Sequence, residues 1–283
     1  MKINRKKKTT GKRASPSKRS VEPEKDEDED LPVRKIADIK RHRSYAFYGR
    51  SGSGKTTLSA TFPKPILYID IRDEGTDSIA DVEGIDVLEP KTVEEFEDAL
   101  FWLIKNPKKY RTVVIDTVTQ LQEMAVEEIG AAKSRKSKKP GEWGSMTKQA
   151  WGEVSGKLKS LIIDFRNLPM EVVFIAQDRV FNLDDEEGED SELMPEVGPR
   201  LMPSVASVLN AAVTVIGNTF IRHVTVKKKV KGVMKRTEKT EYCLRVGPSH
   251  VYITKIRKPR SIGAPEFISD PTYESILEVI KGE

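Results

Sequence analysis

Short apolar runs alternate with helix-like stretches through most of the chain. Runs rich in β-branched and aromatic residues, as expected for strands, lie at 45–48, 65–70, 112–116 and 172–176. The third run, TVVID, is nearly all β-branched, which is typical of a strand buried on both faces of a parallel sheet. Apolar residues recur at helical spacing over 92–106 and 145–167. The alternation predicts an α/β fold with a mainly parallel central sheet flanked by helices.

The predicted helices have recognisable ends. Thr92 with Glu95 predicts a capping box at the start of the first helix, which ends at Asn106-Pro107. Pro169 ends the second helix.

The pattern becomes antiparallel toward the C-terminus. Runs at 220–229 and 234–246 flank Lys231-Gly232, a predicted hairpin turn. A further strand is expected at 251–253 and a short final helix at 275–280.

The first thirty residues carry charge but few apolar side chains. Residues 1–19 hold nine Lys/Arg and no acid, whereas residues 22–30 hold seven acids and one lysine. We therefore expect a disordered charged tail over 1–30 and a folded core over 31–283. The basic half is expected to bind nucleic acid or to act as a localisation signal, unless the acidic half masks it.

Composition narrows the class of protein. The chain is 37% hydrophobic and 33% charged, and no apolar run approaches the length of a membrane span or resembles a signal peptide. The single Cys243 excludes an internal disulfide framework and a zinc cluster. We therefore expect a cytoplasmic protein that makes no membrane contact.

The segment Gly49-Arg50-Ser51-Gly52-Ser53-Gly54-Lys55-Thr56 matches the phosphate-binding pattern G-x-x-x-x-G-K-[ST]. It follows a predicted strand and leads into helix-compatible residues that begin with Thr57. Glycines let the backbone turn so that successive N–H groups point at one phosphate, and a helix N-terminus adds a positive field. Lys55 is expected to reach the β- and γ-phosphates of ATP, and Thr56 to bind Mg²⁺. The filled positions disfavour the alternative, an incidental glycine-rich turn.

Asp116 closes the third predicted strand, where a Walker B aspartate holds Mg²⁺ through water. Thr117 follows, at a position where many ATPases carry the glutamate that activates water. A general base for hydrolysis therefore has to come from elsewhere. Glu74 is the nearest candidate and Asp73 the second, although a polar turn without a catalytic role also accounts for both. Gln177, just past the fourth strand, is positioned to sense the γ-phosphate.

Several segments resemble the RecA core in order and spacing, and most closely the short RecA-like ATPases of bacteriophages, including the single-strand annealing (Sak) proteins. The resemblance covers about residues 40–280. The matching segments are Tyr68-Ile69-Asp70 with Glu74, Val113-Val114-Ile115-Asp116-Thr117, Phe174-Ile175-Ala176-Gln177-Asp178-Arg179, Gln149-Ala150-Trp151-Gly152-Glu153-Val154 and Thr254-Lys255-Ile256-Arg257.

The resemblance implies a RecA-like P-loop NTPase core in which the Gln177 strand lies between the phosphate-loop and Walker B strands. It also implies assembly into a ring or filament with ATP at the subunit interfaces. Lys255 and Arg257 match positions from which RecA-like proteins send cations onto a neighbour's γ-phosphate. The alternative is a solvated or DNA-facing strand end.

The resemblance places two DNA-contacting loops. The first falls on a basic segment, in which cations suit phosphate contact and an aromatic residue suits base stacking, unless it is simply solvated. The second falls on the strongly acidic segment 184–190, so either DNA touches only its edges or the acidic segment competes with DNA until binding displaces it. The expected DNA-binding residues are Lys133, Arg135, Lys136, Lys138, Lys139 and Trp143 for the first loop and Arg179 and Arg200 for the second.

The resemblance implies an ATP-binding protein that binds single-stranded DNA and promotes annealing or pairing in phage recombination. We expect a DNA-stimulated ATPase that forms homo-oligomers in the host cytoplasm, with a phage or host single-strand-binding protein as a further partner. The alternative is an assembly or regulatory ATPase that acts on protein partners. A small-molecule phosphotransferase is disfavoured, because no acceptor-pocket or lid motif is readable.

Overall fold

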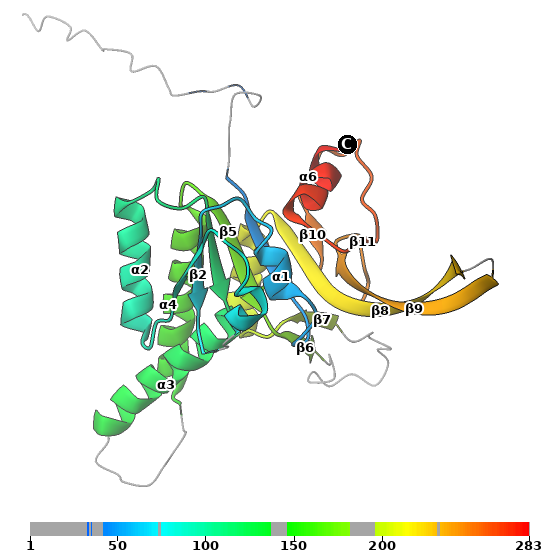
Figure 1. Ribbon diagram of the computed structural model, residues 1–283. Coiled ribbons are helices and arrows are strands. Elements are labelled where there is room, and N and C mark those ends of the chain that lie inside the picture. Colours follow the sequence, from blue (N-terminus) through cyan, green and yellow to red (C-terminus); the bar gives the residue numbers. More distant parts are fainter. Residues whose placement is uncertain are drawn as a thin grey trace, which may run out of the picture. The chain divides into compact units, whose positions relative to one another are not determined.

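A nine-stranded sheet organises the chain (Figure 1). The computed structural model describes residues 33, 35, 42–72, 75–136, 146–181, 196–230 and 233–282. The sheet belongs to a unit that spans Arg41–Glu283. Its strand order is β11-β9-β8-β1-β5-β4-β2-β3, with β10 paired to β8. The predicted tail over 1–30 lies outside the described residues, so its boundary stays a prediction.

The half of the sheet from β1 to β3 is parallel, as the sequence predicts. Every residue of β1, β5, β4 and β2 is buried, which explains why apolar side chains predominate in them. β5 lies between β1 and β4, as the resemblance implies. The bounds are β1 (Ser44–Tyr48), β2 (Ile66–Asp70), β3 (Ile85–Leu88), β4 (Thr112–Asp116) and β5 (Glu171–Ala176).

Helices cover both faces of the sheet, because alternate strand residues point to opposite sides. In β1, Ala46 and Tyr48 join one apolar core, while Tyr45 and Phe47 join the other. The helices on the first face are α2 (Val93–Lys105), α3 (Val118–Lys136), α4 (Lys148–Arg166) and α5 (Pro203–Ala212). The other face is covered by α1 (Lys55–Ser59) and α6 (Tyr273–Lys281), and the short helix η2 (Gly75–Ile79) also contributes to its core.

The C-terminal part is antiparallel. β8 (Val215–Val230) starts beside β1 and then pairs along its length with β9 (Val233–Arg245). We call residues 219–230 and 233–244 of this hairpin the ribbon; Figure 1 shows it in yellow and orange. β10 (Lys255–Ile256) pairs with the start of β8, and β11 (Phe267–Ser269) with the end of β9. A separate small sheet pairs β6 (Asp178–Phe181) with β7 (Glu196–Pro199).

The predicted strand at 251–253 is wrong. Tyr252 makes only an isolated bridge with Val197. The N–H groups of Val251 and Tyr252 both donate to Ser249 Oγ, so a turn takes up donors that a strand ladder needs. The predicted hairpin turn Lys231-Gly232 lies outside the described residues.

Two further predictions need correction. Thr92 caps α2 by accepting from the Glu95 N–H, but the Glu95 carboxylate binds the Lys91 N–H, so the capping box is only half formed. α4 begins at Lys148, where Thr147 caps the helix, rather than at 145. Among the described residues, none of the helices is both long enough and apolar enough to span a bilayer.

Candidate functional site

The loop between β1 and α1 follows a tight path that its glycines permit. Gly54 has φ 88°, a left-handed conformation that favours glycine. A Cβ at Gly49 would lie 2.4 Å from the Thr219 carbonyl oxygen, so any side chain there would clash with β8. α1 is only five residues long, so loop N–H groups rather than a long helix dipole provide most of the positive field expected for an anion.

Lys55 holds the curled loop together. Its side chain is buried, and Nζ donates to the carbonyl oxygens of Gly49 at 2.9 Å and Arg50 at 2.8 Å. Ser53 Oγ donates to the same Arg50 oxygen at 2.7 Å. The ammonium group is thus held inside the loop, where the sequence pattern predicts contact with phosphate.

A cluster of oxygen atoms lies beside the loop. Thr56 Oγ1 donates to Asp116 Oδ2 at 3.2 Å, and Tyr68 Oη donates to the same oxygen at 2.5 Å. Burial, reinforced by the Asp116 carboxylate, raises the pKa of Tyr68 well above its ordinary value, so this phenol stays protonated. The hydroxyl and carboxylate oxygens of Thr56 and Asp116 form the donor set that Mg²⁺ prefers. These two residues would hold the ion, and a bound ion would neutralise phosphate charge.

The end of β2 turns toward the same cluster. Asp70 is buried and accepts from Thr76 Oγ1 at 3.1 Å. A Cβ at Gly75 would lie 3.4 Å from Thr56 Oγ1 and 3.6 Å from Asp116 Oδ2. The turn after β2 therefore places Gly75 beside the oxygen cluster.

A family model for the AAA domain matches residues 41–258. The chain belongs to the AAA domain family. A comparison with curated proteins found no match. The AAA domain is a P-loop NTPase, which indicates nucleotide binding, and residues 49–56 match the phosphate-loop sequence pattern of this class. The match also covers Asp116, Gln177, Lys255 and Arg257.

Most of the predicted nucleotide residues lie close together in the structure. Gly49 to Thr57 form the curled loop and the start of α1, and Asp116 at the end of β4 contacts Thr56. The peptide bond between Asp116 and Thr117 is cis. The predicted base Glu74 and its alternative Asp73 lie outside the described residues. Gly75, the next residue in the chain, lies beside Thr56 and Asp116.

Gln177 and Arg200 contact each other. Arg200 Nη1 donates to Gln177 Oε1 at 3.0 Å, and the Arg200 N–H donates to the Gln177 carbonyl oxygen at 2.7 Å. Arg200 also pairs with Glu123 at 3.3 Å. The predicted phosphate sensor and a predicted DNA contact are therefore joined in one small network at the end of β5.

Lys255 and Arg257 bind the C-terminal end of α5. Lys255 Nζ donates to the carbonyl oxygens of Asn210 and Ala211, and Arg257 Nη2 donates to that of Ala211. Burial, followed by the nearby positive charges of Arg257 and Arg166, lowers the pKa of Lys255 to about 8. Within one chain, the two cations occupy the edge of the sheet where β1 begins, opposite to the phosphate loop.

The predicted DNA-contacting residues are spread over several elements. Lys133, Arg135 and Lys136 lie in the last part of α3 rather than in a loop, because the helix continues to Lys136. Arg179 lies in β6 with its guanidinium 5.3 Å from the Phe181 ring. The remaining residues of this set, Lys138, Lys139 and Trp143, and the acidic segment 184–190 lie outside the described residues.

Sequence reasoning missed three residues that contact the phosphate-loop site. Tyr68 binds Asp116, and Thr219 Oγ1 lies 2.6 Å from Ser53 Oγ. A Cβ at Gly54 would lie 3.0 Å from Tyr242 Cδ1. Tyr68 carried a usable signal, because its alternation on β2 could place it on the α1 face. The positions of Thr219 and Tyr242 depend on the pairing of β8 with β1, which no local pattern specifies.

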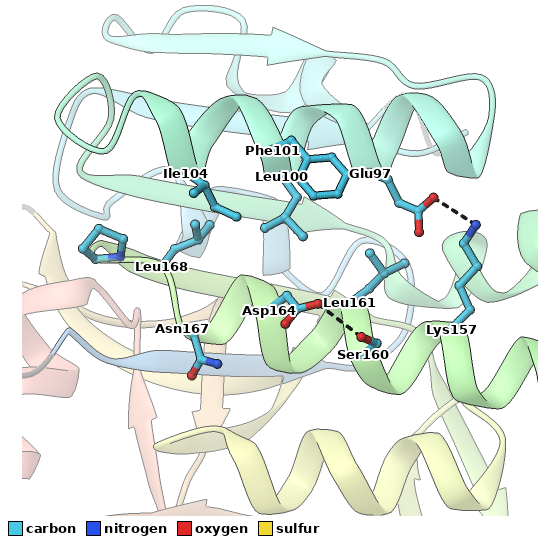
Figure 2. Close-up of a pocket in the computed structure, with 11 residues that line it drawn as sticks. Glu97, Leu100, Phe101, Ile104, Lys157, Ser160, Leu161, Asp164, Asn167 and Leu168 are labelled. Carbon is cyan, nitrogen blue, oxygen red and sulfur yellow. Dashed lines mark hydrogen bonds and ion pairs between the residues drawn. The ribbon is translucent and has the colours of Figure 1, made fainter.

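A groove of about 700 Å³ lies away from this site, between α2 and α4 (Figure 2). Leu100, Phe101 and Ile104 from α2 line one wall, and the last turns of α4 line the other. An ion pair between Lys157 and Glu97, at 3.0 Å, closes one end. The groove adjoins the edge of the sheet where β4 and β5 begin, so it is separate from the phosphate loop.

Proposed function

We propose that this AAA domain protein is an ATPase that assembles with Mg²⁺-ATP between neighbouring copies, binds single-stranded DNA, and promotes annealing or pairing of strands in phage recombination. ATP would favour the assembled state, and hydrolysis would release it. A phage or host single-strand-binding protein is a further expected partner. The observation that carries the proposal is the position of Lys255 and Arg257 at the edge of the sheet opposite to the phosphate loop.

The edge-to-edge arrangement supports an interface role. β10 pairs with Val215 and Ile216, which lie beside Tyr45 and Ala46 at the start of β1. The phosphate loop follows the other end of β1. Lys255 and Arg257 lie where β1 begins, and the phosphate loop lies where β1 ends. The cations of one copy can therefore reach a phosphate loop only in a neighbouring copy that is stacked head to tail. A γ-phosphate is a stronger acceptor than the helix carbonyls that these cations now bind.

Charge and sequence support the DNA part of the proposal. Lys133, Arg135 and Lys136 end α3, and the following residues to 139 add two more lysines before Trp143. Cations neutralise strand phosphates and release counterions, and an aromatic ring stacks an unpaired base. Because α3 begins directly after Asp116 and Thr117, this segment is connected to the nucleotide site through one helix.

The test compares ATPase activity with and without a single-stranded oligonucleotide, alongside sizing with and without ATP. We expect DNA to stimulate hydrolysis and ATP to increase the assembled mass. Lys255→Ala with Arg257→Ala should remove both effects while the single chain still binds nucleotide. Neutralising the lysines and Arg135 over 133–139 should remove only the DNA effect. The proposal fails if ATP and the oligonucleotide do not influence each other's binding.

A second candidate function is a regulatory or assembly ATPase that acts on protein partners. The groove in Figure 2 favours it, because Phe101 and Ile104 are 58% and 54% exposed beside an apolar channel. Charged substitutions such as Phe101→Glu should then abolish the action on protein partners and leave oligonucleotide binding intact. The opposite pattern supports the DNA-binding proposal.

A further inference from the structure

The ribbon begins where the phosphate loop begins. β8 pairs with β1 only as far as Asn218, opposite Tyr48, and Gly49 starts the loop. β11 supports only residues 243–245 of β9. We call residues 219–221 and 242–244, which lie beside the loop and β11, the root of the ribbon. Beyond the root, among the described residues, β8 and β9 pair with each other alone, out to Val230 opposite Val233. At about 3.4 Å per residue, the unsupported part extends on the order of 30 Å.

Charged residues are arranged differently near the root and in the outer part of the ribbon. Near the root, Arg222 pairs with Glu241 at 2.7 Å, and Lys239 pairs with Asp270 at 3.1 Å. Farther out, the backbone register sets Lys227 opposite Arg236 and Lys228 opposite Lys235.

Like charges directly opposite each other destabilise a strand pair, and an isolated two-stranded hairpin is only marginally stable. Residues 227–236 contain six Lys/Arg and no acid. This part of the chain therefore has a charge pattern that weakens its own pairing and that a polyanion would relieve.

The composition of residues 227–236, which we call the outer ribbon, indicates which class of polyanion it would bind. Residues 227–236 contain no aromatic side chain, so they lack the stacking platform that unpaired bases use. A two-stranded ribbon fits the major groove of B-form DNA, which is about 12 Å wide, with cations on the phosphates at its sides. Duplex DNA is the ligand class that combines dense regular phosphate charge with a groove of this size.

The root joins the ribbon to the nucleotide site. The Thr219 and Ser53 hydroxyls share a hydrogen bond across their 2.6 Å contact, and each also contacts a carbonyl oxygen, Thr219 that of Tyr48 and Ser53 that of Arg50. The Tyr242 ring lies against Gly54, and the Thr219 carbonyl blocks the space beside Gly49. A rearrangement of the loop on phosphate binding would therefore act on the root through these contacts.

We propose that the ribbon is a duplex-DNA-binding arm whose root, through Thr219 and Tyr242, couples DNA binding to occupancy of the phosphate loop. The duplex-binding part goes beyond the proposed function and does not depend on single-strand binding by residues 133–139. By linkage, nucleotide changes the affinity of the arm for the duplex by the same factor by which the duplex changes nucleotide affinity. Thr219 is a positioning residue, because it acts on the loop through Ser53.

The first test measures binding of the full chain to a labelled 30-base-pair duplex and to a single strand of the same length over a salt series. The variant Lys227→Gln, Lys228→Gln, Lys229→Gln should lose at least tenfold in duplex affinity. Its salt slope should fall by about 3, since each lost phosphate contact contributes ~0.9. Single-strand and nucleotide affinity should change less than twofold.

The matched control removes the same charge from exposed residues at the end of α2 and in the α2–β4 connection, by Lys105→Gln, Lys108→Gln, Lys109→Gln. It should retain duplex affinity. Equal loss in the control, equal loss of single-strand and duplex binding in the ribbon variant, or unchanged duplex binding would each overturn the proposal.

The second test addresses the coupling. With a non-hydrolysable ATP analogue, duplex affinity of the wild type should change about fivefold or more, a typical coupling magnitude. Thr219→Val should bring that ratio toward one, whereas Thr219→Ser, which keeps the hydroxyl, should preserve it. A purely structural role predicts equal weakening with and without the analogue and an unchanged ratio, which would overturn the coupling. Melting temperatures of both variants show that each is folded.

Discussion

At the residue scale, one carboxylate oxygen connects three elements. Asp116 Oδ2 accepts hydrogen bonds from Thr56 at the start of α1 and from Tyr68 on β2. Charge-assisted hydrogen bonds of this kind are stronger than neutral ones. Tyr68 therefore fixes the orientation of Asp116 without itself being a metal ligand.

Tyr68→Phe removes one buried donor from this oxygen. We expect a loss of about 1–2 kcal/mol in the free energy of unfolding, because a buried acceptor loses a partner that water cannot replace. Urea unfolding without nucleotide measures it.

Tyr110→Phe is the matched control, since Tyr110 donates at 2.7 Å to Asp86, which is exposed and can be solvated again. An equal loss in both variants would show that burial of Asp116 is not the cause.

Lys255 gives a pH-dependent prediction. The folded chain releases this proton near pH 8, whereas the unfolded chain keeps it to about 10.5. Between these values the unfolded state binds more protons, so this group adds stability as pH rises through the window. The difference in unfolding free energy between wild type and Lys255→Met should therefore shift in favour of the wild type from pH 7.5 to 9.5. A pH-independent difference would contradict the lowered pKa.

At the element scale, α6 is attached by its first turn. Thr272 and Ser275 form a complete capping box, and the Tyr273 N–H donates to Thr61 Oγ1 just after α1. Ile276 and Ile280 are buried on the face that α1 also covers. The cap therefore connects the end of the chain to the first helix after the phosphate loop.

Thr272→Ala should destabilise the protein by about 1 kcal/mol, the usual cost of losing an N-cap. Amide exchange should accelerate in α6 more than in the central strands. Exposed Ser261→Ala serves as the control and should leave both measurements unchanged. Uniform acceleration across the sheet would indicate that α6 does not open as a separate unit.

The central elements were predictable because their signals are local. The buried strand TVVID, the phosphate loop and Thr92 each follow from the chemistry of a few adjacent residues. α3 was missed because its sequence, rich in Gln, Glu and Lys, has a weak apolar stripe. β6 and β7 were missed because each is only four residues long, and no residue of β6 is buried. The contacts of Thr219 and Tyr242 with the loop arise from long-range pairing, which local patterns do not encode.

At the scale of the whole molecule, the loop links ligand binding to stability. A ligand that binds only the folded chain raises stability by RT ln(1 + [L]/Kd), or about 2.7 kcal/mol at a hundredfold excess over Kd. Mg²⁺ with ADP should therefore raise the melting temperature of the wild type. Lys55→Ala should abolish this increase, and Lys108→Ala, at an exposed position, should not. A nucleotide effect that survives Lys55→Ala would place the binding site elsewhere.

The position of β1 has a consequence for how the chain is made. Among the described strands, β1 comes earliest in the chain, yet its two neighbours supply Ala176 and Asn218 opposite Tyr48. Contacts between residues so distant in sequence form late in folding. β1 can therefore pair with both neighbours only after most of the chain has been synthesised. The phosphate-loop site of the nascent protein is therefore incomplete until β8 has been synthesised. Nucleotide binding can stabilise only a chain that extends past β8.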